Sequence, residues 1–370
     1  MKEILFYAEY PTADNVREGM FQRISAVDER FRGCRRIYLS VSLSKNRRPF
    51  HWRNEAGDVE VWRLNFFLHG LTVRRIVAQY RNVYIHSVHG YAKLFPFSLR
   101  GKNVSLDFHG TVPEEVTFRG RRLLGRFFKY LERCLVPQVG NFIYVSDEMR
   151  RFYLESYPFI RDRKHLLNPI YPQNLLADEA ASPQPPADPG VTSPKAETLR
   201  RELGIGPDDV VFVYSGNLQK WQNVGLTIDC MNRIARDNYF FLFLSGQPEA
   251  LQEMIRRQTT RDDLRYTVRK VAPEELSNYY EIAHYGFILR DDHLLNRVSA
   301  PTKLVEYLHH GLTAIVKYEV VGDAYSLGYE YLRYDADLTN LQPSKSDKNC
   351  QVARQLFQRS QDIDLPALYD

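Results

Sequence analysis

The sequence predicts an α/β protein with two Rossmann-like domains, and three observations lead to this prediction. Strand-like apolar runs alternate with helical patterns in both halves of the chain, as in the βαβ units of a parallel sheet. The length of 370 residues exceeds what one hydrophobic core usually organises. Residues 177–197 are rich in Pro, Ala, Ser and Asp, lack aromatic side chains and separate the two halves.

These observations also predict the domain boundaries. We expect an N-terminal domain over 1–172, a linker or surface insertion over 173–200 and a C-terminal domain over 201–345. Residues 346–370 contain the helical pattern CQVARQLFQRS. The sequence leaves open whether this C-terminal helix packs back on the N-terminal domain.

The first half contains six strand-like runs, and it is the less regular of the two. They are EILFYAE (3–9), RIYLSVS (36–42), VEVWRL (59–64), NVYIHSV (82–88), NVSLDFHG (103–110) and FIYVSD (142–147). Ligands of such sheets bind beyond the carboxyl ends of the strands. His86, His109 and Ser146 come at these ends and are therefore candidates for a site.

The second half alternates regularly between strands and helices. Its strand-like runs are VVFVYSG (210–216), YFFLFLSG (239–246), LRYTVRKV (264–271), YGFILR (285–290) and TAIV (313–316). Its helical patterns cover 224–235, 248–257, 273–283 and 301–310. Gly216, Ser245, Gly246 and Arg290 follow predicted strands, so the same rule makes them candidates.

The stretch RVSAPTKLVEYLHHGLTAIV, 297–316, holds a helix whose start is unusual. Pro301 suits a first helical turn because its missing N–H would be unbonded there, and Gly311 suits the end. Lys303 in the first turn opposes the helix dipole, whereas a bound phosphate at the N-terminus would favour it. These residues alone leave two readings open, a capped helix with a solvated lysine and a phosphate site.

Composition and cysteine usage exclude several classes of protein. With 44% hydrophobic and 26% charged residues the chain is an ordinary globular protein, and no apolar run approaches the length of a membrane span. The start MKEILFYAEYP predicts a first strand and not a signal peptide. Four cysteines without CxxC spacing indicate neither a zinc site nor a disulfide framework, so a reducing cytoplasm is expected.

The net charge of +5 conceals an asymmetry between the halves. Residues 1–170 carry 29 Lys and Arg against 17 Asp and Glu, whereas the remaining residues carry 21 against 28. A basic first half is attracted to phosphates, anionic lipid or nucleic acid. No nucleic-acid-binding motif is present, and no GxGxxG follows a strand, so neither a nucleic-acid-binding protein nor a nicotinamide dehydrogenase is predicted.

Four stretches resemble GT-B glycosyltransferases, specifically the bacterial family-4-like branch that builds surface polysaccharides. They are VFVYSGNLQKWQNVGLTID, RDDHLLNRVSAPTKLVEYLHHGLTAIV, DFHGTVPEE and FIYVSDEM. The resemblance implies two Rossmann-like domains facing each other across a cleft. It further implies metal-independent transfer of a hexose from a UDP- or GDP-sugar to a glycan or lipid-diphosphate-linked acceptor.

The resemblance places the nucleotide-sugar donor on the C-terminal domain. Lys303, Lys220 and the start of the 301–310 helix would hold the diphosphate, and Glu306 would bind the ribose hydroxyls. The residues expected to bind the donor nucleotide are Gly216, Asn217, Lys220, Arg290, Ser299, Pro301, Thr302, Lys303 and Glu306.

The chain departs from the family pattern at two positions. Val298 stands eight residues before Glu306, where the family usually has its first Glu, and Asp291 or Asp292 would have to replace that carboxylate. Asn217 stands where an Arg is common. Nucleotide binding remains expected, while retention of the anomeric configuration is favoured by family alone.

Residues of the first half are candidates for catalysis and acceptor binding. His109, by resemblance, contacts the donor sugar or the acceptor hydroxyl; the alternative is a polar turn residue next to Gly110, which would let a ligand approach. Asp107 and Glu114 are the other catalytic candidates, although Asp107 also suits a structural role. Arg17, Gly19 and Glu115 are expected to bind the acceptor; Glu114 and Glu115 alternatively only begin a helix.

We predict no metal site. His86 and His89 have metal-like spacing, but no third ligand follows at a plausible distance in the sequence. The sequence DAD at 335–337 resembles the metal-binding motif of the other glycosyltransferase fold, but it lies in a polar loop beyond the last predicted strand.

Residues 118–135 predict one amphipathic helix with a basic side. Its apolar residues, expected to face the sheet, are Leu123, Leu124, Phe127, Phe128, Leu131, Cys134 and Leu135. Its basic residues are Arg119, Arg122, Arg126, Lys129 and Arg133. These either form a solvated face or lie on an anionic membrane surface.

The sequence thus predicts a cytoplasmic glycosyltransferase, with peripheral attachment to the inner face of the plasma membrane as an open alternative. The rival hypothesis is a catalytically silent GT-B subunit that binds a nucleotide-sugar or a partner without turnover, because Val298 replaces the first Glu.

Overall fold

The computed structural model divides the chain into two units, and each is described by itself. The first unit comprises Met1–Ile170 with Ser360–Asp370, and the second comprises Tyr171–Arg359. The structure describes residues 1–370 except 13–14, 16–18, 96, 170, 172–192 and 362. Most of the predicted linker, 173–200, lies outside the described residues.

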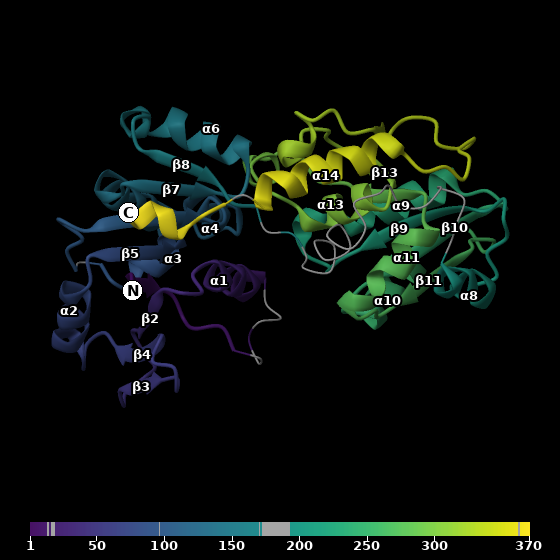
Figure 1. The fold of residues 1–370 in the computed structure, drawn as a ribbon. Coiled ribbons are helices and arrows are strands. Elements are labelled where there is room, and N and C mark those ends of the chain that lie inside the picture. The colour runs from purple at the N-terminus through teal and green to yellow at the C-terminus, as the bar shows by residue number, and fades with distance from the viewer. Residues whose placement is uncertain (13–14, 16–18, 96, 170, 172–192, 362) are drawn as a thin grey trace. The chain divides into compact units, whose positions relative to one another are not determined.

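The first unit contains an eight-stranded sheet (Figure 1). Across the sheet the strands are β3 (Phe50–Arg53), β4 (Val59–Asn65), β2 (Arg35–Ser42), β1 (Glu3–Tyr7), β5 (Asn82–His86), β6 (Asn103–Phe108), β7 (Asn141–Tyr144) and β8 (Lys164–Leu167). All neighbours are parallel except β3 and β4. The six strands that the sequence predicts are present, whereas β3 and β8 were not predicted.

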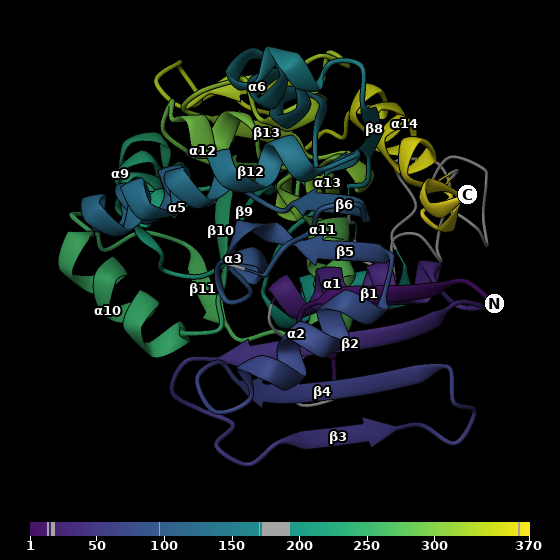
Figure 2. The same cartoon turned by 90° about the vertical axis from the view of Figure 1, so that its left-hand side faces the viewer.

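Helices connect these strands and cover the sheet. They are α1 (Gly19–Arg30), α2 (Gly70–Gln79), α3 (Ser87–Ala92), α4 (Val112–Phe118), α5 (Arg122–Leu135) and α6 (Asp147–Ser156). Figure 2 shows α2, α3 and α5 in front of the sheet. The chain's last residues join this unit, where the Tyr369 hydroxyl donates to the Val83 carbonyl oxygen at 3.1 Å.

The second unit contains a six-stranded, entirely parallel sheet. Across the sheet the strands are β11 (Tyr266–Arg269), β10 (Tyr239–Leu244), β9 (Val210–Ser215), β12 (Tyr285–Ile288), β13 (Thr313–Val316) and β14 (Tyr331–Arg333). This is the 3-2-1-4-5-6 order of Rossmann folds. The predicted α/β class is therefore confirmed.

The helices of the second unit cover both faces of its sheet. They are α8 (Pro194–Glu202), α9 (Val224–Ile234), α10 (Pro248–Gln258), α11 (Leu276–Ile282), α12 (Leu294–Arg297), α13 (Thr302–His309) and α14 (Asp347–Gln361). Helix α8 begins inside the predicted linker, and its Ala196 and Leu199 belong to the core of this unit.

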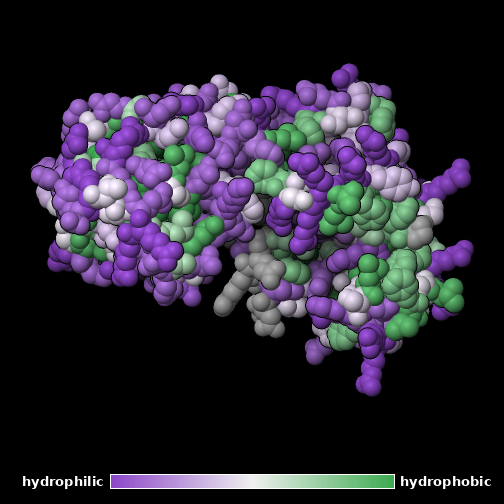
Figure 3. Space-filling view, turned by 180° about the vertical axis from the view of Figure 1, so that it is seen from behind, coloured by the Kyte–Doolittle hydropathy of each residue, from purple (hydrophilic) through white to green (hydrophobic). Residues whose placement is uncertain are grey.

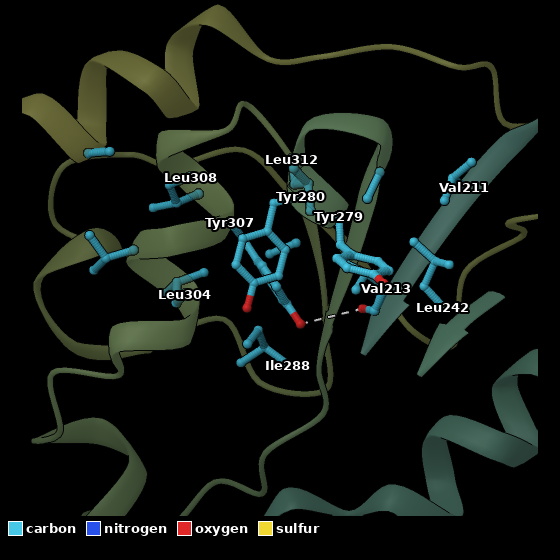
Figure 4. Close-up of a cluster of buried hydrophobic side chains, with 14 of the residues drawn as sticks. Val211, Val213, Leu242, Tyr279, Tyr280, Ile288, Leu304, Tyr307, Leu308 and Leu312 are labelled. Carbon is cyan, nitrogen blue, oxygen red and sulfur yellow. Dashed lines mark hydrogen bonds between the residues drawn. The ribbon is translucent and has the colours of Figure 1, made fainter. Parts of the chain in front are cut away.

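Apolar side chains of the second sheet form a core on each face because alternate residues of a strand point to opposite sides. One of these cores is closed by Tyr307 of α13 (Figure 4). The Tyr307 hydroxyl accepts from the Ser215 N–H at 3.0 Å and donates to the Val213 carbonyl at 3.5 Å. Gly286 makes room for this ring, since a Cβ there would lie 2.3 Å from Tyr307 Cδ2. Helix α13 is thus fixed against the carboxyl end of β9.

Two further predictions differ from the structure. The single helix expected over 118–135 is broken, because Gly120 has a φ of +82° and the chain turns between α4 and α5. Strand β14 lies beyond the last predicted strand, so DAD 335–337 directly follows a strand of the sheet. Among the described residues, none of the helices is both long and apolar enough to cross a bilayer.

Candidate active site

A crevice for ligands is expected in the second unit where its strand order reverses, between β9 and β12. Gly216 follows β9, and Arg290 comes two residues after β12. The N-terminus of α13, which presents backbone N–H groups and a partial positive charge, is fixed to the same end of β9 by Tyr307. Strand topology therefore collects these groups at one place.

Lys303 is a buried cation at this point. Its ammonium donates to Gln222 Oε1 at 3.1 Å and lies 4.5 Å from the centre of the Tyr214 ring. Burial, together with the charge of Arg290, lowers the Lys303 pKa to about 7. Gly216, with a φ of +148°, gives this ammonium its space, because a Cβ there would lie 2.5 Å from Nζ.

Arg290 is the second cation of the crevice. Burial lowers the Arg290 pKa to about 10, and its buried Nε has no hydrogen-bond partner. Its Nη1 donates to Ser299 Oγ at 3.3 Å. Within the described ranges neither Arg290 nor Lys303 has a carboxylate within 4 Å. Two desolvated cations that have no direct ion pair in the described residues form a binding site for an anion, although the charge of Glu306 acts on Lys303 from a greater distance.

Glu306, one turn into α13, supplies acceptor oxygens beside these cations. Its carboxylate accepts from the Tyr280 hydroxyl at 3.1 Å, and Tyr280 is held in turn by Ser215 Oγ at 2.8 Å. Burial raises the Glu306 pKa. The carboxylate is half-buried, so it can accept hydrogen bonds from ligand hydroxyls as well as from Tyr280.

The other predicted donor residues differ in exposure. Pro301 is buried and precedes α13, whereas the side chains of Asn217, Lys220 and Thr302 are exposed. The two carboxylates expected to replace the missing Glu are engaged elsewhere. Asp291 pairs with Lys317 at 2.5 Å, and Asp292 pairs with Arg297 at 2.5 Å.

The first unit holds a buried polar network at the carboxyl ends of β5 and β6. Asp107 is fully buried, and its carboxylate accepts from Arg23 Nε at 3.0 Å, Arg23 Nη2 at 2.5 Å and the Tyr84 hydroxyl at 2.9 Å. His109 Nε2 lies 3.2 Å from Asp107 Oδ2 and 3.3 Å from His86 Nδ1. These contacts hold the Asp107 pKa far below its usual value.

This arrangement assigns different parts to the three residues. The side chain of His109 is 15% exposed and can reach a ligand, whereas Asp107 and His86 are enclosed. Asp107 can therefore act only by orienting His109 and neutralising Arg23, which makes it a positioning residue. Two buried partners fix the His109 ring, which agrees both with a ligand contact and with the polar turn residue that the sequence leaves open.

The same cluster has a metal-like arrangement that sequence spacing did not reveal. Ligand atoms of His86, Asp107 and His109 lie within 4.8 Å of one another, whereas His89 packs its ring 4.5 Å from Phe128. The Arg23 guanidinium donates hydrogen bonds to both oxygens of the Asp107 carboxylate and places a positive charge next to it. A cation there would have to displace that guanidinium, so the residues fit a hydrogen-bond network better than a metal site.

The remaining candidates of the first unit fall into separate places. Glu114 Oε1 accepts from Lys129 at 3.3 Å, which ties Glu114 to α5. The Glu115 carboxylate covers Gly110, because a Cβ on Gly110 would meet its oxygen; the space that we expected a ligand to use is therefore filled. Arg17 lies outside the described residues, and Gly19 begins α1.

A surface pocket of the first unit lies next to this network. It is lined by the end of β1 and the residues after it, by β2, by the end of β5 with α3, and by the start of α1; the lining includes Glu9, Met20, Phe21, Ser40, His86 and Lys93. Strand order reverses between β1 and β5, so the pocket occupies the switch point of this sheet. It combines an apolar wall with charged and hydroxyl groups and suits a polar ligand that carries an apolar part.

Several residues of both sites escaped sequence analysis. In the first unit they are Arg23 and Tyr84, and in the second they are Gln222 and Tyr280. Arg23 had a detectable signal: it lies four residues before Val27, on the apolar stripe of α1, where a charged residue requires a buried partner. The others had none, because tyrosines in apolar patterns are equally expected in a core.

Buried histidines predict that the protein loses stability in mild acid. Burial lowers the pKa of His86, His109 and His310, and it lowers that of His284 to about 3. Each is neutral when folded but takes up a proton near pH 6.5 when unfolded, so stability falls as pH drops below that value. We expect a loss of up to about 2 kcal/mol for each histidine at pH 5. Urea unfolding at pH 8, 7, 6 and 5 measures it, and a constant midpoint contradicts the prediction.

Comparison with known proteins adds evidence on the fold. No protein-family model and no curated protein sequence matches the chain. An α,α-trehalose-phosphate synthase (UDP-forming) from Burkholderia vietnamiensis superposes with a TM-score of 0.63 at 13% identity, over 100% of this chain and 98% of that one. A sucrose-phosphate synthase from Thermosynechococcus elongatus gives 0.62 at 12%, over 100% and 96%. A glycosyltransferase from Rickettsia africae gives 0.59 at 11%, over 99% and 95%. The chain therefore has the fold of the GT-B glycosyltransferases, with two Rossmann-like domains.

Proposed function

We propose that the protein is a glycosyltransferase that takes a hexose from a nucleotide-diphosphate sugar. The observation that carries this proposal is the pair of cations formed by the buried Lys303 at the start of α13 and the partly buried Arg290 after β12. A folded protein gains no stability from desolvating two charges that form no direct ion pair. A bound diphosphate supplies the missing negative charge, and so explains why both side chains are there.

Each group of the crevice then has a role. Lys303, Arg290 and the N–H groups of α13 bind the diphosphate and stabilise the charge that develops on it as the sugar leaves. The Glu306 carboxylate accepts hydrogen bonds from the ribose hydroxyls. A similar solved structure from E. coli is bound with UDP-2-fluoro glucose, which supports UDP as the nucleotide to test here, with GDP as the alternative.

The pocket of the first unit is proposed to bind the acceptor. Met20 and Phe21 offer apolar surface, and Lys93 offers a cation. This combination suits a lipid-diphosphate-linked glycan, as in the synthesis of bacterial surface polysaccharides at the inner face of the plasma membrane. A related structure, from Burkholderia xenovorans, is in complex with glucose-6-phosphate, so a phosphorylated sugar is the alternative acceptor class.

We further infer transfer with retention and without a metal. An inverting mechanism needs a general base within reach of the acceptor hydroxyl. Of the two carboxylates predicted as catalytic, Asp107 is occupied by Arg23 and Tyr84, and Glu114 is tied to Lys129. Retention lets the departing diphosphate accept that proton, and the cations of the crevice replace a metal in stabilising its charge.

A second candidate function is a silent subunit that binds a nucleotide-sugar without turnover. Val298, which replaces the first Glu, is 3% exposed and brings no polar atom of its side chain to the crevice. Binding and turnover must therefore be measured separately.

Calorimetric titration of UDP and of GDP in EDTA tests the donor site. We expect one nucleotide to bind in the micromolar range. Release of that nucleotide from its hexose donors then tests turnover, and His109→Ala should abolish turnover while nucleotide binding stays unchanged. Binding without any turnover supports the silent subunit. Failure of both nucleotides to bind overturns the proposal.

A further inference from the structure

Helix α5 exposes several of its apolar side chains instead of burying them. The buried residues of the helix are Gly125, Phe128, Leu131, Glu132 and Leu135. Leu123 is 81% exposed, Tyr130 is 56% exposed and Phe127 is 48% exposed. At helical spacing these three lie side by side, on the surface that points away from the core. The prediction that Leu123 and Phe127 face the sheet was wrong.

Arginines flank this apolar stripe. Arg122 and Arg126 lie on its border, are exposed and have no carboxylate within 4 Å in the described part of the chain. Lys129 differs from the prediction, because it turns inward to Glu132 at 2.7 Å and Glu114 at 3.3 Å. An exposed apolar ridge with a cationic border is typical of a helix that lies in a lipid–water interface.

A second exposed cluster, at the start of α2, has the same composition. Phe67, Leu68 and Leu71 are 74%, 63% and 81% exposed, and the exposed Arg74 and Arg75 follow them. Helices α2 and α5 lie on the same side of the sheet (Figure 2). Hydrophobic side chains gather on the first unit among hydrophilic ones (Figure 3, right).

Aromatic contacts extend each cluster toward the turn that follows α3. The Tyr130 ring lies 6.3 Å from that of Phe95, and the Phe66 ring lies 6.0 Å from that of Phe97 and 5.2 Å from that of Phe67. Phe95 and Phe97 are two residues apart, so the clusters belong to one surface. We call this surface, made by 66–75, 95, 97 and 118–130, the interfacial face.

We propose that the interfacial face docks on an anionic lipid bilayer, with Leu71, Leu123 and Phe127 inserted among the acyl chains and the arginines at the headgroups. Charge complementarity favours this occupant, since residues 1–170 carry 29 basic against 17 acidic side chains. The apolar side chains also protrude from two helices and do not line a groove. Sugar transfer is not a premise of this inference.

Docking on a bilayer would also bring the proposed acceptor pocket close to a lipid-linked acceptor. Lys93 and Leu94 line the acceptor pocket and directly precede Phe95 of the interfacial face. A diphosphate carried on a membrane lipid would therefore meet Lys93 close to the membrane surface. This step rests on the proposed function, whereas the docking is measured without any substrate.

Sedimentation of the full chain with vesicles tests the docking. We expect binding to phosphatidylcholine vesicles that contain about 30% phosphatidylglycerol, and binding roughly tenfold or more weaker to pure phosphatidylcholine. Arg122→Glu with Arg126→Glu, and separately Leu123→Ser with Phe127→Ser, should each weaken binding to the anionic vesicles roughly tenfold or more.

Matched controls separate the local surface from net charge and general hydrophobicity. Arg256→Glu with Arg257→Glu makes the same charge change on α10, and Tyr325→Ser removes another exposed ring of the second unit. Both should bind within about twofold of the wild type. The inference is overturned if the wild type does not sediment, or if the control variants lose as much binding as the test variants.

Hydrogen exchange of the unaltered protein provides a test that depends on no variant. Vesicles should protect amides in 66–75 and 118–130. Protection only elsewhere would show that vesicles bind another surface and would overturn the inference. A dimer in light scattering that Leu123→Ser with Phe127→Ser dissociates would show that a second copy covers this face.

Discussion

Lys303→Met should weaken nucleotide binding by about a hundredfold or more, or about 3 kcal/mol. Methionine keeps the length of the side chain and its packing on Tyr214, so the loss reports the missing charge. Lys270→Met changes an exposed lysine of the same unit and should leave the affinity unchanged. Calorimetric titration of the better nucleotide gives both values.

Stability distinguishes this loss from damage to the fold. The Lys303 pKa is lowered to about 7, which means that burial of its charge costs free energy in the empty protein. Lys303→Met removes this cost, so the variant should unfold at an equal or higher urea concentration than the wild type. A variant that loses both binding and stability would contradict the role of Lys303 as an anion ligand.

The pH dependence of binding follows from the same group. A diphosphate favours the charged ammonium, so binding raises the Lys303 pKa and takes up a proton when the solution is near or above pH 7. Affinity should therefore fall as pH rises from 7 to 9. Lys303→Met should lose this dependence.

Sequence pattern was sufficient for the parts of the fold that depend on periodicity. Central strands such as β9 and β10 are buried on both faces, so they form apolar runs that are easily recognised. Strand β3 escaped because all four of its residues are exposed, and β14 because it has only three. Helix boundaries near 120 depended on one glycine with positive φ, a feature that periodicity does not encode.

The sites were predictable where the chain brings their residues together locally. Ser299, Lys303 and Glu306 lie within eight residues, and one helix start positions them. By contrast, the contacts of Arg290 with Ser299 and of Lys303 with Gln222 form only because β9 and β12 end next to each other in the folded sheet. In the first unit, Arg23 meets Asp107 across 84 residues, so only the folded sheet shows that the carboxylate is already occupied.

Asp107→Asn should destabilise the first unit by about 3–5 kcal/mol. The substitution keeps the shape of the side chain but leaves the Arg23 guanidinium, which is 5% exposed, without its counter-ion. The amide oxygen of Asn is also a weaker hydrogen-bond acceptor than the carboxylate that Tyr84 and His109 contact. Urea unfolding at pH 7, followed by circular dichroism, measures the change.

A double-mutant cycle separates the ion pair from its surroundings. Replacing both partners, as in Arg23→Met with Asp107→Leu, removes the buried charges together and should recover more than half of the loss. Additive effects of the two single variants would show that the pair does not couple. A loss below about 1 kcal/mol for Asp107→Asn would show that the charge of this carboxylate contributes little to the stability of the first unit.

The pH dependence of this effect has a definite sign. The Asp107 pKa is depressed in the folded state, so its contribution is complete above the unfolded value of about 3.9 and is lost as pH falls below it. Because Asp107 also raises the pKa of His109, the difference between the wild type and Asp107→Asn should not shrink between pH 7 and pH 5, and it should shrink below about pH 4. The histidine-dependent loss between pH 7 and pH 5 should occur in both proteins, because His284 and His310 lie in the second unit and do not touch Asp107. If the difference instead disappears between pH 7 and pH 5, then histidine protonation and not the Arg23–Asp107 pair determines the stability of this network.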